Sequence, residues 1–366
     1  MKKTALIALM LLAPFTARAE YPLPYMGEIQ EIRAKYEDTF VYLARDYGLG
    51  FVEMRAANPA LDPWIPGAGA EIVLPTQFIL PDAPHKGVVI NLPEMRLYAY
   101  VNGDKAPTTY PIGIGREGLD TPLGVTKIVR KAEGPIWTPT PRMRREKPDL
   151  PAQMGPGPEN PMGTHALYLG FPLVAIHGTN RAFGIGRRIS SGCIRLYPED
   201  IIALYNSIPV GTQVTVVNQP IKLSWIGEQL FIEAHPEVDQ AIRMEETGEI
   251  VSAKLSDADM ARIIKAAGPY KERLQWPAIR KAVKERRGYP IAIARRSGVD
   301  VNAEAEMQGV DDSHLAKKDT VKKAEVAQAL EVLYAGEEQV QDLNIDPKEK
   351  KKPGFYAKRP KRDFNP

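Results

Sequence analysis

The sequence is poor in the residues that usually bind metals: its 366 residues include one Cys, Cys193, and five His. A single thiol cannot form a disulfide within its own chain, so its special roles are an intermolecular disulfide or a reactive nucleophile. No Cys pair, His pair or acidic cluster has metal-ligand spacing, and no Walker or dinucleotide fingerprint is present. We therefore predict no metal and no cofactor.

Long hydrophobic runs are lacking as well. The stretch from Thr4 to Phe15 is apolar, but about 12 such residues cannot cross a bilayer core of roughly 30 Å. It follows Lys2 and Lys3 and precedes the small-residue triplet Ala17-Arg18-Ala19, which is the pattern of a secretory signal peptide. We expect residues 1–19 to be removed, and we expect the exported chain not to span a membrane.

An excess of charge of one sign is also absent. Lys and Arg number 48 against 45 Asp and Glu, and removing residues 1–19 takes away Lys2, Lys3 and Arg18 but no anion. The mature chain is then formally neutral, which gives no electrostatic reason to bind nucleic acid. Exported proteins usually have paired cysteines or none. The lone Cys193 is therefore the most informative feature of the composition.

Proline is abundant, with 33 residues, and the length fits two or three units with long loops. The first predicted unit, residues 37–80, has two short helices between strands. Asp38 or Thr39 is placed to cap the first helix, and Gly48 to end it. The order of these landmarks resembles that of a LysM glycan-binding module. A generic two-helix cap on the next domain is the alternative.

From residue 86 the sequence has the alternation typical of strands. The predicted strands are 87–92, 96–101, 110–115, 124–129, 166–169, 173–176 and 213–217. A helix from Pro198 to Ser207 precedes the last strand. Residues 134–163 are rich in Pro, Gly and Arg and have no apolar periodicity, so we interpret them as a lid. These features predict a mainly β domain over residues 86–218.

The remaining chain predicts a hairpin plus helices over residues 219–296, then a polar tail. The predicted elements are strands 221–226 and 229–233, a helix that Ser256 opens and that runs to about Ala267, and a helix from Pro277 to Arg287 closed by Gly288. Residues 297–366 are polar and end in a basic cluster. Disorder is the expected state of this tail, and attraction to anionic envelope polymers is the alternative.

The candidate chemistry lies in His177-Gly178-Thr179-Asn180 and in Ser190-Ser191-Gly192-Cys193-Ile194-Arg195-Leu196. His177 follows a predicted strand and Cys193 precedes a predicted helix, so both lie where rigid elements meet loops. A thiol, with a reference pKa of about 8.5, is a good nucleophile once a nearby imidazole removes its proton. A helix N-terminus near Pro198 also favours a thiolate. Either residue alone is more often structural.

The combination resembles the L,D-transpeptidase (YkuD) family, and most closely its periplasmic branch in Gram-negative bacteria. The resemblance covers about residues 86–218 and is strongest over 176–196. It implies a YkuD-type β-sandwich with a short helix after the cysteine, preceded by a LysM-like unit of α and β structure. The chain after it is expected to be rich in helix and partly disordered. A periplasmic location follows from the same resemblance and the signal peptide.

On this resemblance, Cys193 is the nucleophile, His177 is the base, and the Gly178 carbonyl orients the imidazole. Backbone N–H groups near Gly192 are candidates for an oxyanion hole. The predicted substrate-binding residues are Ser190, Ser191, Gly192, Arg195 and Arg188.

One departure from the family pattern concerns the bases. Ser191 stands where many members have His, so His177 is the one base within the motif. His165, on the preceding predicted strand, either faces the cleft or has the structural role that we expect.

The implied reaction is a two-step acyl transfer on peptidoglycan. Cys193 attacks the carbonyl between diaminopimelate and the terminal D-Ala of a tetrapeptide stem, D-Ala leaves with a proton from His177, and a thioester remains. A second diaminopimelate then gives a 3–3 cross-link, an amine of an outer-membrane or other envelope protein gives an anchored protein, and water gives a carboxypeptidase. The expected partners are stem peptides and glycan strands. Their carboxylates suit Arg187, Arg188 and Arg195 near the motif and Arg142, Arg144 and Arg145 in the lid, although lid arginines can equally be solvated.

Two other classes of protein compete with this interpretation. A papain-like peptidase places Cys before His, whereas here His177 precedes Cys193. A non-catalytic wall-binding protein, in which the LysM-like unit is the functional part, would form no covalent adduct.

Overall fold

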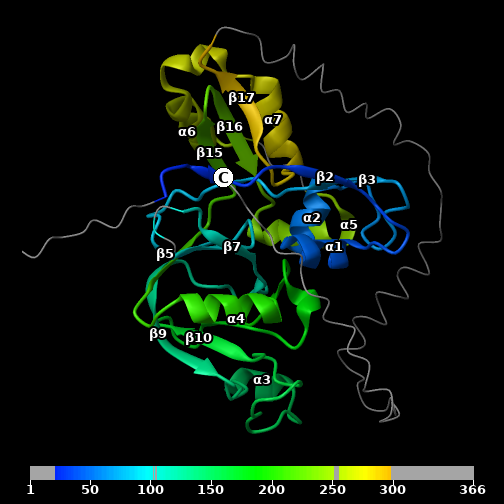
Figure 1. Cartoon of the computed structure of the whole chain (residues 1–366), viewed down its shortest axis with the longest axis vertical. Coiled ribbons are helices and arrows are strands. Elements are labelled where there is room, and N and C mark those ends of the chain that lie inside the picture. Colours follow the sequence, from blue (N-terminus) through cyan, green and yellow to red (C-terminus); the bar gives the residue numbers. More distant parts are fainter. Residues whose placement is uncertain (1–20, 102, 104, 251–254, 298–366) are drawn as a thin grey trace, which may run out of the picture. The chain divides into compact units, whose positions relative to one another are not determined.

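The computed structural model describes residues 21–101, 103, 105–250 and 255–297. The predicted signal peptide and the predicted tail beyond Ser297 lie outside these residues, which Figure 1 draws in grey. Among the described helices, none is long and apolar enough to cross a membrane.

The N-terminal segment has two helices between two paired strands, as predicted. It contains β1 (Tyr25–Met26), β2 (Gln30–Arg33), α1 (Phe40–Tyr47), α2 (Phe51–Ala57), β3 (Glu71–Leu74) and β4 (Phe78–Ile79). The Thr39 side chain caps α1 by accepting from the Tyr42 N–H, and Gly48 ends the helix in a left-handed conformation with φ of 59°. Asp38 accepts from the backbone N–H of Lys35 instead. Strands β2 and β3 pair antiparallel.

A curled sheet of eight strands forms the middle of the chain, which is mainly β (Figure 1). Its strands, in sheet order, are β13 (Ile194–Arg195), β11 (Ala175–His177), β10 (His165–Leu169), β9 (Gly124–Glu133), β14 (Gln213–Val217), β5 (Gly87–Asn91), β6 (Arg96–Tyr100) and β7 (Thr108–Pro111). Neighbours pair antiparallel except for β14 with β5 and β11 with β13, which are parallel.

The predicted strand 110–115 is broken in the structure. Its first half belongs to β7, whereas β8 (Ile114–Gly115) pairs with β12 (Arg188–Ser190) in a separate two-stranded sheet. Between them, Gly113 exchanges two backbone hydrogen bonds of 2.9 Å with Arg195. A Cβ atom at Gly113 would lie 2.5 Å from the Gly184 carbonyl oxygen. The chain therefore bends at a glycine to approach the loop that carries Cys193.

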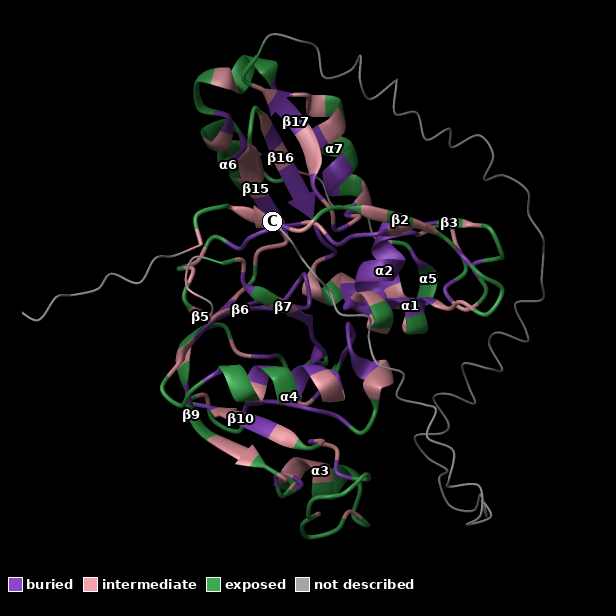
Figure 2. Ribbon diagram, viewed as in Figure 1, coloured by how far each residue is buried: buried purple, intermediate pink, exposed green. Residues whose placement is uncertain are grey.

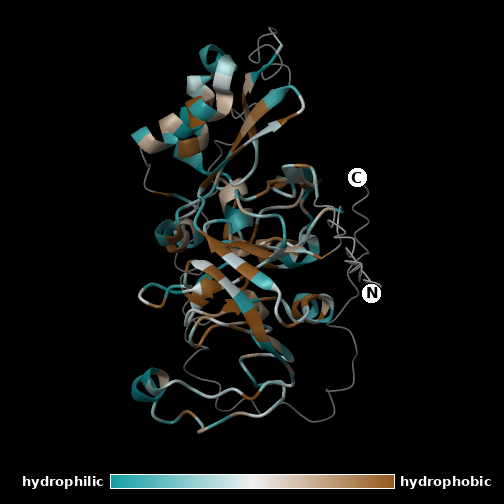
Figure 3. Ribbon diagram, turned by 90° about the vertical axis from the view of Figure 1, so that its left-hand side faces the viewer, coloured by the Kyte–Doolittle hydropathy of each residue, from teal (hydrophilic) through white to brown (hydrophobic). Residues whose placement is uncertain are grey.

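The two faces of the sheet have different roles because side chains alternate along each strand. Leu167, Ile176 and Ile194 point toward the core, where they pack with residues of α4 (Pro198–Ser207) such as Ile201 and Leu204. Hydrophobic colour is concentrated on the strands in Figure 3. The opposite face of β10 and β11 carries the candidate functional residues described below.

The predicted lid contains one short helix, α3 (Pro141–Glu146), and is fastened at its base by Asn160. The buried Asn160 side chain donates to the carbonyl oxygens of Pro135, at 2.7 Å, and Gly155, at 3.0 Å, and accepts from the Met162 N–H at 2.9 Å. Such bonds fix the backbone of a loop that has no apolar periodicity.

The C-terminal described segment is a three-stranded antiparallel sheet with helices. Its elements are β15 (Ile221–Ile226), β16 (Gln229–Ala234), η2 (Val238–Gln240), α5 (Ala241–Thr247), α6 (Asp257–Ala267), η3 (Gly268–Arg273), α7 (Trp276–Glu285) and β17 (Ile291–Arg295). The predicted hairpin and the helix opened by Ser256 are present. The last helix ends at Glu285 and is capped by Arg286, with φ of 47°, and not by Gly288. Strand β17 has no counterpart in the prediction.

Candidate active site

Pairing of β11 with β13 brings His177 and Cys193 to one face of the sheet. The strands are parallel, with His177 opposite Arg195 and Ile176 opposite Ile194. Side chains two residues apart share a face, so Cys193 lies on the side of Arg195 and therefore of His177. A backbone hydrogen bond with Ala175, the residue two before His177, fixes the thiol there.

His177 is held in one tautomer. Its Nδ1 donates to the Gly178 carbonyl oxygen over 2.6 Å, so Nε2 is the nitrogen that can accept a proton. Burial, and then the positive charge of Arg195, lower the pKa of His177 to about 4, although the hydrogen bonds that the imidazole donates to the backbone of Gly178 and Met162 raise it in part. The predicted contact with the Gly178 carbonyl is therefore present. The imidazole is neutral at neutral pH.

Cys193 lies partly buried at the rim of a small hydrophobic cluster. Trp137 and Tyr168 border the cluster beside it, and the Sγ atom lies 3.6 Å from the Leu173 carbonyl oxygen. Burial raises the pKa of the thiol, whereas the hydrogen bond with Ala175 and the charge of Arg195 lower it less. The thiol is thus protonated in the resting site.

The predicted stabilisation of a thiolate by the N-terminus of α4 is opposed by negative charge. Glu199 and Asp200 lie in the first turn of α4. Glu199 is paired with Arg45 at 2.9 Å, so Asp200 is the acidic side chain that offsets the positive end of the helix dipole.

The backbone around Cys193 is shaped by neighbouring hydroxyl groups. Gly192 has φ of 99°, and its carbonyl oxygen accepts from the Thr121 hydroxyl over 3.1 Å. The buried Ser190 hydroxyl donates to the Cys193 carbonyl oxygen over 2.5 Å. Within the described chain, no acceptor is paired with the backbone N–H groups of Gly192 and Cys193. These two donors suit an oxyanion hole.

The predicted substrate-binding residues divide into two groups. Ser190 and Gly192 shape the backbone as described, and Ser191 accepts from Arg142 of the lid over 2.9 Å. Arg142 also pairs with Glu146 at 2.5 Å. Arg195 lies beside His177 and Cys193, where its charge acts on both pKa values.

Arg188 differs from its predicted role. Its side chain is 6% exposed and pairs with Asp120. It also donates to the carbonyl oxygens of Gly115, at 3.1 Å, and Val238, at 3.3 Å. A guanidinium with these partners holds the loop together, which gives Arg188 a structural role, and its assignment to substrate binding stays a prediction.

Other sequence candidates are also engaged within the protein. Arg187 is buried between the rings of Phe51 and Phe183 and pairs with Glu245. In the lid, Arg144 donates to the Ala152 carbonyl oxygen over 2.7 Å. Arg187 and Arg144 therefore contribute to packing within the protein. Arg145 lies exposed in α3.

His165 lies on the core side of β10. Ala166, the next residue, is opposite His177, so His165 points to the other face. There its ring packs edge-on against Tyr205 of α4, with 4.6 Å between centroids. The structural role that we expected for His165 agrees with this position.

The sequence did not identify three residues near the site, which are Trp137, Tyr168 and Thr121. Trp137, a lone aromatic residue in the polar lid, was the one usable signal, because aromatic residues in loops often contact ligands. The sequence gives no such signal at the other two positions, because Tyr168 resembles any strand residue and Thr121 any loop residue.

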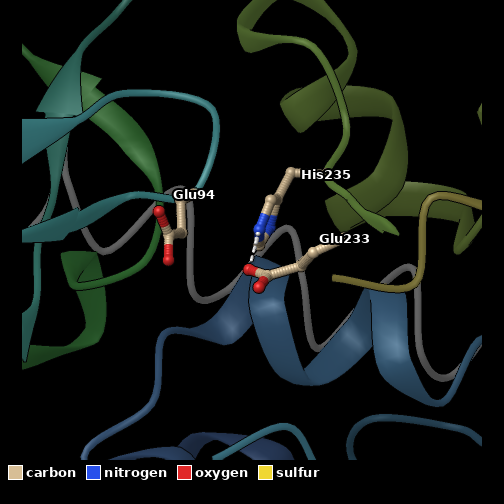
Figure 4. A group of neighbouring side chains, drawn as sticks. All are labelled: Glu94, Glu233 and His235. Carbon is tan, nitrogen blue, oxygen red and sulfur yellow. Dashed lines mark hydrogen bonds and ion pairs between the residues drawn. The ribbon is translucent and has the colours of Figure 1, made fainter. Parts of the chain in front are cut away.

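Three described side chains outside this site are close enough to hold a metal ion. The ligand atoms of Glu94, Glu233 and His235 lie within 4.8 Å of one another, and Figure 4 shows His235 bonded to Glu233. Lys222 already occupies this group, with its Nζ 2.8 Å from Glu94 and 2.7 Å from Glu233. An ammonium group there neutralises the carboxylates and competes with a cation. We interpret the group as a buried ion-pair network.

The fold and the site together define a mainly β domain that presents a thiol and an imidazole on one sheet face. A family model described as the L,D-transpeptidase catalytic domain (YkuD) matches residues 85–216. The chain is 43% identical over 249 residues to the Probable L,D-transpeptidase YbiS of Escherichia coli, covering 64% of this chain and 81% of that protein. It is 30% identical over 187 residues to the Putative L,D-transpeptidase YkuD of Bacillus subtilis, covering 50% of this chain and 96% of that protein. The chain belongs to the L,D-transpeptidase family.

Among solved structures, the chain is similar to L,D-transpeptidase 3 from Mycobacterium tuberculosis. Identity is 19%, coverage is 40% of this chain and 67% of that chain, and the TM-score is 0.30.

Proposed function

We propose that Cys193 and His177 carry out L,D-transpeptidation on peptidoglycan stem peptides in this chain. The main support is the register of β11 with β13, which puts the thiol and the imidazole on one sheet face. His177 Nε2 takes the thiol proton as Sγ bonds to the scissile carbonyl carbon, and the N–H groups of Gly192 and Cys193 stabilise the oxyanion. The imidazolium then gives its proton to the departing D-Ala amine, and a thioester remains.

The second step is the reverse of the first with a new amine. His177 removes a proton from the acceptor amine as its nitrogen attacks the thioester carbonyl, and the thiol leaves protonated. The acceptor is a second diaminopimelate, which gives a 3–3 cross-link, or an amine of an envelope protein.

The other parts of the chain fit this function. We propose that residues 37–80 are a LysM-like module that binds glycan strands, that residues 86–218 are the catalytic domain, and that the signal pattern in residues 1–19 directs the protein to the periplasm. The order of β2, α1, α2 and β3 supports the first of these proposals. Residues 219–296 then form an extension in which β15, β16, β17, α6 and α7 share a core, whereas Ala241 and Met244 of α5 pack into the core of the large sheet.

The assignment of Cys193 is tested by Cys193→Ser. We expect a folded protein that forms no acyl-enzyme with a tetrapeptide stem, because a hydroxyl is far harder to ionise than a thiol. Intact-mass spectrometry detects the acyl-enzyme, and Ser207→Ala, a hydroxyl in α4, is a control that should acylate like the wild type. More than a few per cent of wild-type transfer in Cys193→Ser would remove Cys193 from the mechanism.

The acceptor is identified in cells. Mass spectrometry of peptidoglycan from cells with and without the gene distinguishes 3–3 cross-links from attached protein. The absence of both products would contradict transpeptidation.

A further inference from the structure

We propose that Arg130, stacked on Tyr168, binds a carboxylate of a stem peptide during the reaction. The inference rests on the proposed function and adds a substrate-binding residue to it. Arg130 lies in β9, outside both motif segments.

Strand register places Arg130 in one row with the thiol. Arg130 is opposite Tyr168, and Tyr168 is opposite Ala175. Extending the pairing of β11 with β13 by one residue puts Cys193 opposite Ala175. Partners across neighbouring strands share a face, so the row from Arg130 to Cys193 runs across the active-site face. The next residue, Lys131, points to the other face, where its Nζ donates to the Ile208 carbonyl oxygen over 2.8 Å.

The Arg130 guanidinium is held in place while its N–H groups stay accessible. Its central carbon lies 3.6 Å from the centroid of the Tyr168 ring, and Tyr168 borders the same small cluster as Cys193. Stacking fixes the plane of a guanidinium and leaves its edge free for hydrogen bonds. Arg130 is exposed, and in the described part of the chain no carboxylate forms an ion pair with it.

Arg130 contrasts with several arginines that the sequence singled out. Arg142 pairs with Glu146, Arg187 with Glu245 and Arg188 with Asp120. Their charges are neutralised within the protein, whereas the charge of Arg130 is available to a ligand. A planar guanidinium binds a carboxylate through two parallel hydrogen bonds.

The distance suits a stem peptide. Three strand spacings separate Arg130 from Cys193, or about 14 Å between Cα atoms. An extended peptide covers about 3.5 Å per residue. A carboxylate two to four residues from the scissile bond would therefore reach Arg130 while the carbonyl lies at the thiol.

The test compares Arg130→Gln with Lys127→Gln, an exposed position on the same strand. One arm follows thioester formation with a tetrapeptide stem by intact mass, and the other follows transfer from the preformed thioester to an amine-bearing stem peptide. We expect Arg130→Gln to slow one arm about tenfold to hundredfold, mainly through KM, because a hydrogen bond to a charged group is lost. Arg130→Lys should recover part of the loss. Lys127→Gln should resemble the wild type.

The affected arm identifies the source of the carboxylate, the donor stem in the first case and the acceptor stem in the second. Alkylation of Cys193 by iodoacetamide, which has no carboxylate, should be equal in all variants. Wild-type rates in both arms for Arg130→Gln, or a matching fall in alkylation, would overturn the proposal. Failure of the proposed function is a separate outcome, since it would appear as acyl transfer by the Cys193→Ser variant or as the absence of both peptidoglycan products.

Discussion

At the residue scale, the surroundings of the thiol and of the imidazole shift their pKa values apart. Burial raises the pKa of Cys193 and lowers that of His177 to about 4. A thiolate beside an imidazolium is therefore unfavourable in the resting site, and both groups are neutral at neutral pH. In the proposed mechanism the proton therefore moves as the carbon–sulfur bond forms, with His177 acting as a general base and not as the partner of a preformed thiolate.

This leads to a prediction for the pH dependence of acylation. The wild-type rate should rise as the pH passes about 4, where His177 loses its proton, and then stay level up to neutral pH. In His177→Gln the rate at neutral pH should be low and rise about tenfold per pH unit, because only thiolate formed by bulk hydroxide reacts. Intact-mass kinetics with a tetrapeptide stem over a pH series measures both.

His165→Gln is the matched control, since His165 packs on the other face against Tyr205, and it should keep the wild-type profile. Equal rates for His177→Gln and the wild type at neutral pH would reduce His177 to a positioning residue.

At the element scale, the connector between His177 and Cys193 is packed against α2. The backbone N–H of Val52 donates to the Gly186 carbonyl oxygen over 3.1 Å, and Phe51 contacts Phe183 and Trp64 with ring centroids 6.4 and 5.7 Å apart. Helix α2 is buried along its whole length, as Figure 2 shows. The N-terminal segment and the active-site connector thus support each other.

Gly186 is the point of closest approach in this contact. A Cβ atom there would lie 2.2 Å from the Phe51 backbone nitrogen, and φ is 73°. Gly118 has a similar φ of 74° but nothing within 4 Å of its Cβ position. We expect Gly118→Ala to cost about 1 kcal/mol of unfolding free energy and Gly186→Ala about 3 kcal/mol or more. Denaturant unfolding measures both values, and similar costs would contradict the packing argument.

At the scale of the whole described chain, a buried charge network ties three segments together. Glu94 lies in the turn between β5 and β6, whereas Lys222 and Glu233 come from the β15–β16 hairpin. The network reaches β4, where the Ile79 N–H donates to Glu233 over 2.5 Å and its carbonyl oxygen accepts from Lys222 over 2.5 Å. The C-terminal hairpin is therefore joined to the β5–β6 turn of the large sheet by buried charged groups.

Lys222→Met should be strongly destabilising at neutral pH. Although burial alone would raise the pKa of Glu94, Lys222 and then His235 lower it. Without Lys222, burial prevails and the pKa of the Glu94 carboxyl rises above that of the unfolded chain. The loss of unfolding free energy, about 3–5 kcal/mol, should therefore be largest at neutral pH. It should shrink as acid protonates the carboxylates. Unfolding in denaturant over a pH series measures this.

Arg33→Ala is the control, because Arg33 and Glu71 form an exposed ion pair that contributes about 1 kcal/mol or less. A loss for Lys222→Met that stayed constant with pH would argue against the buried network.

The sequence by itself determined the features that depend on neighbouring residues. The cap at Thr39, the glycine end of α1 at Gly48 and the short apolar runs of β5 and β6 are local, so a short window of sequence specifies them. The candidate site was also found in this way, because His177 and Cys193 lie in two short segments with a recognisable pattern.

Tertiary structure decided the rest, because it depends on which distant segments meet. Nothing near Arg188 in the sequence indicates that Asp120 and Val238 would enclose it. Likewise, nothing near Arg130 indicates that strand register would align it with Cys193. A shift of one residue in that register would move Arg130 to the opposite face. Burial and pairing, which set the charge and reach of each side chain, result from the packing of the whole sheet and not from the local pattern.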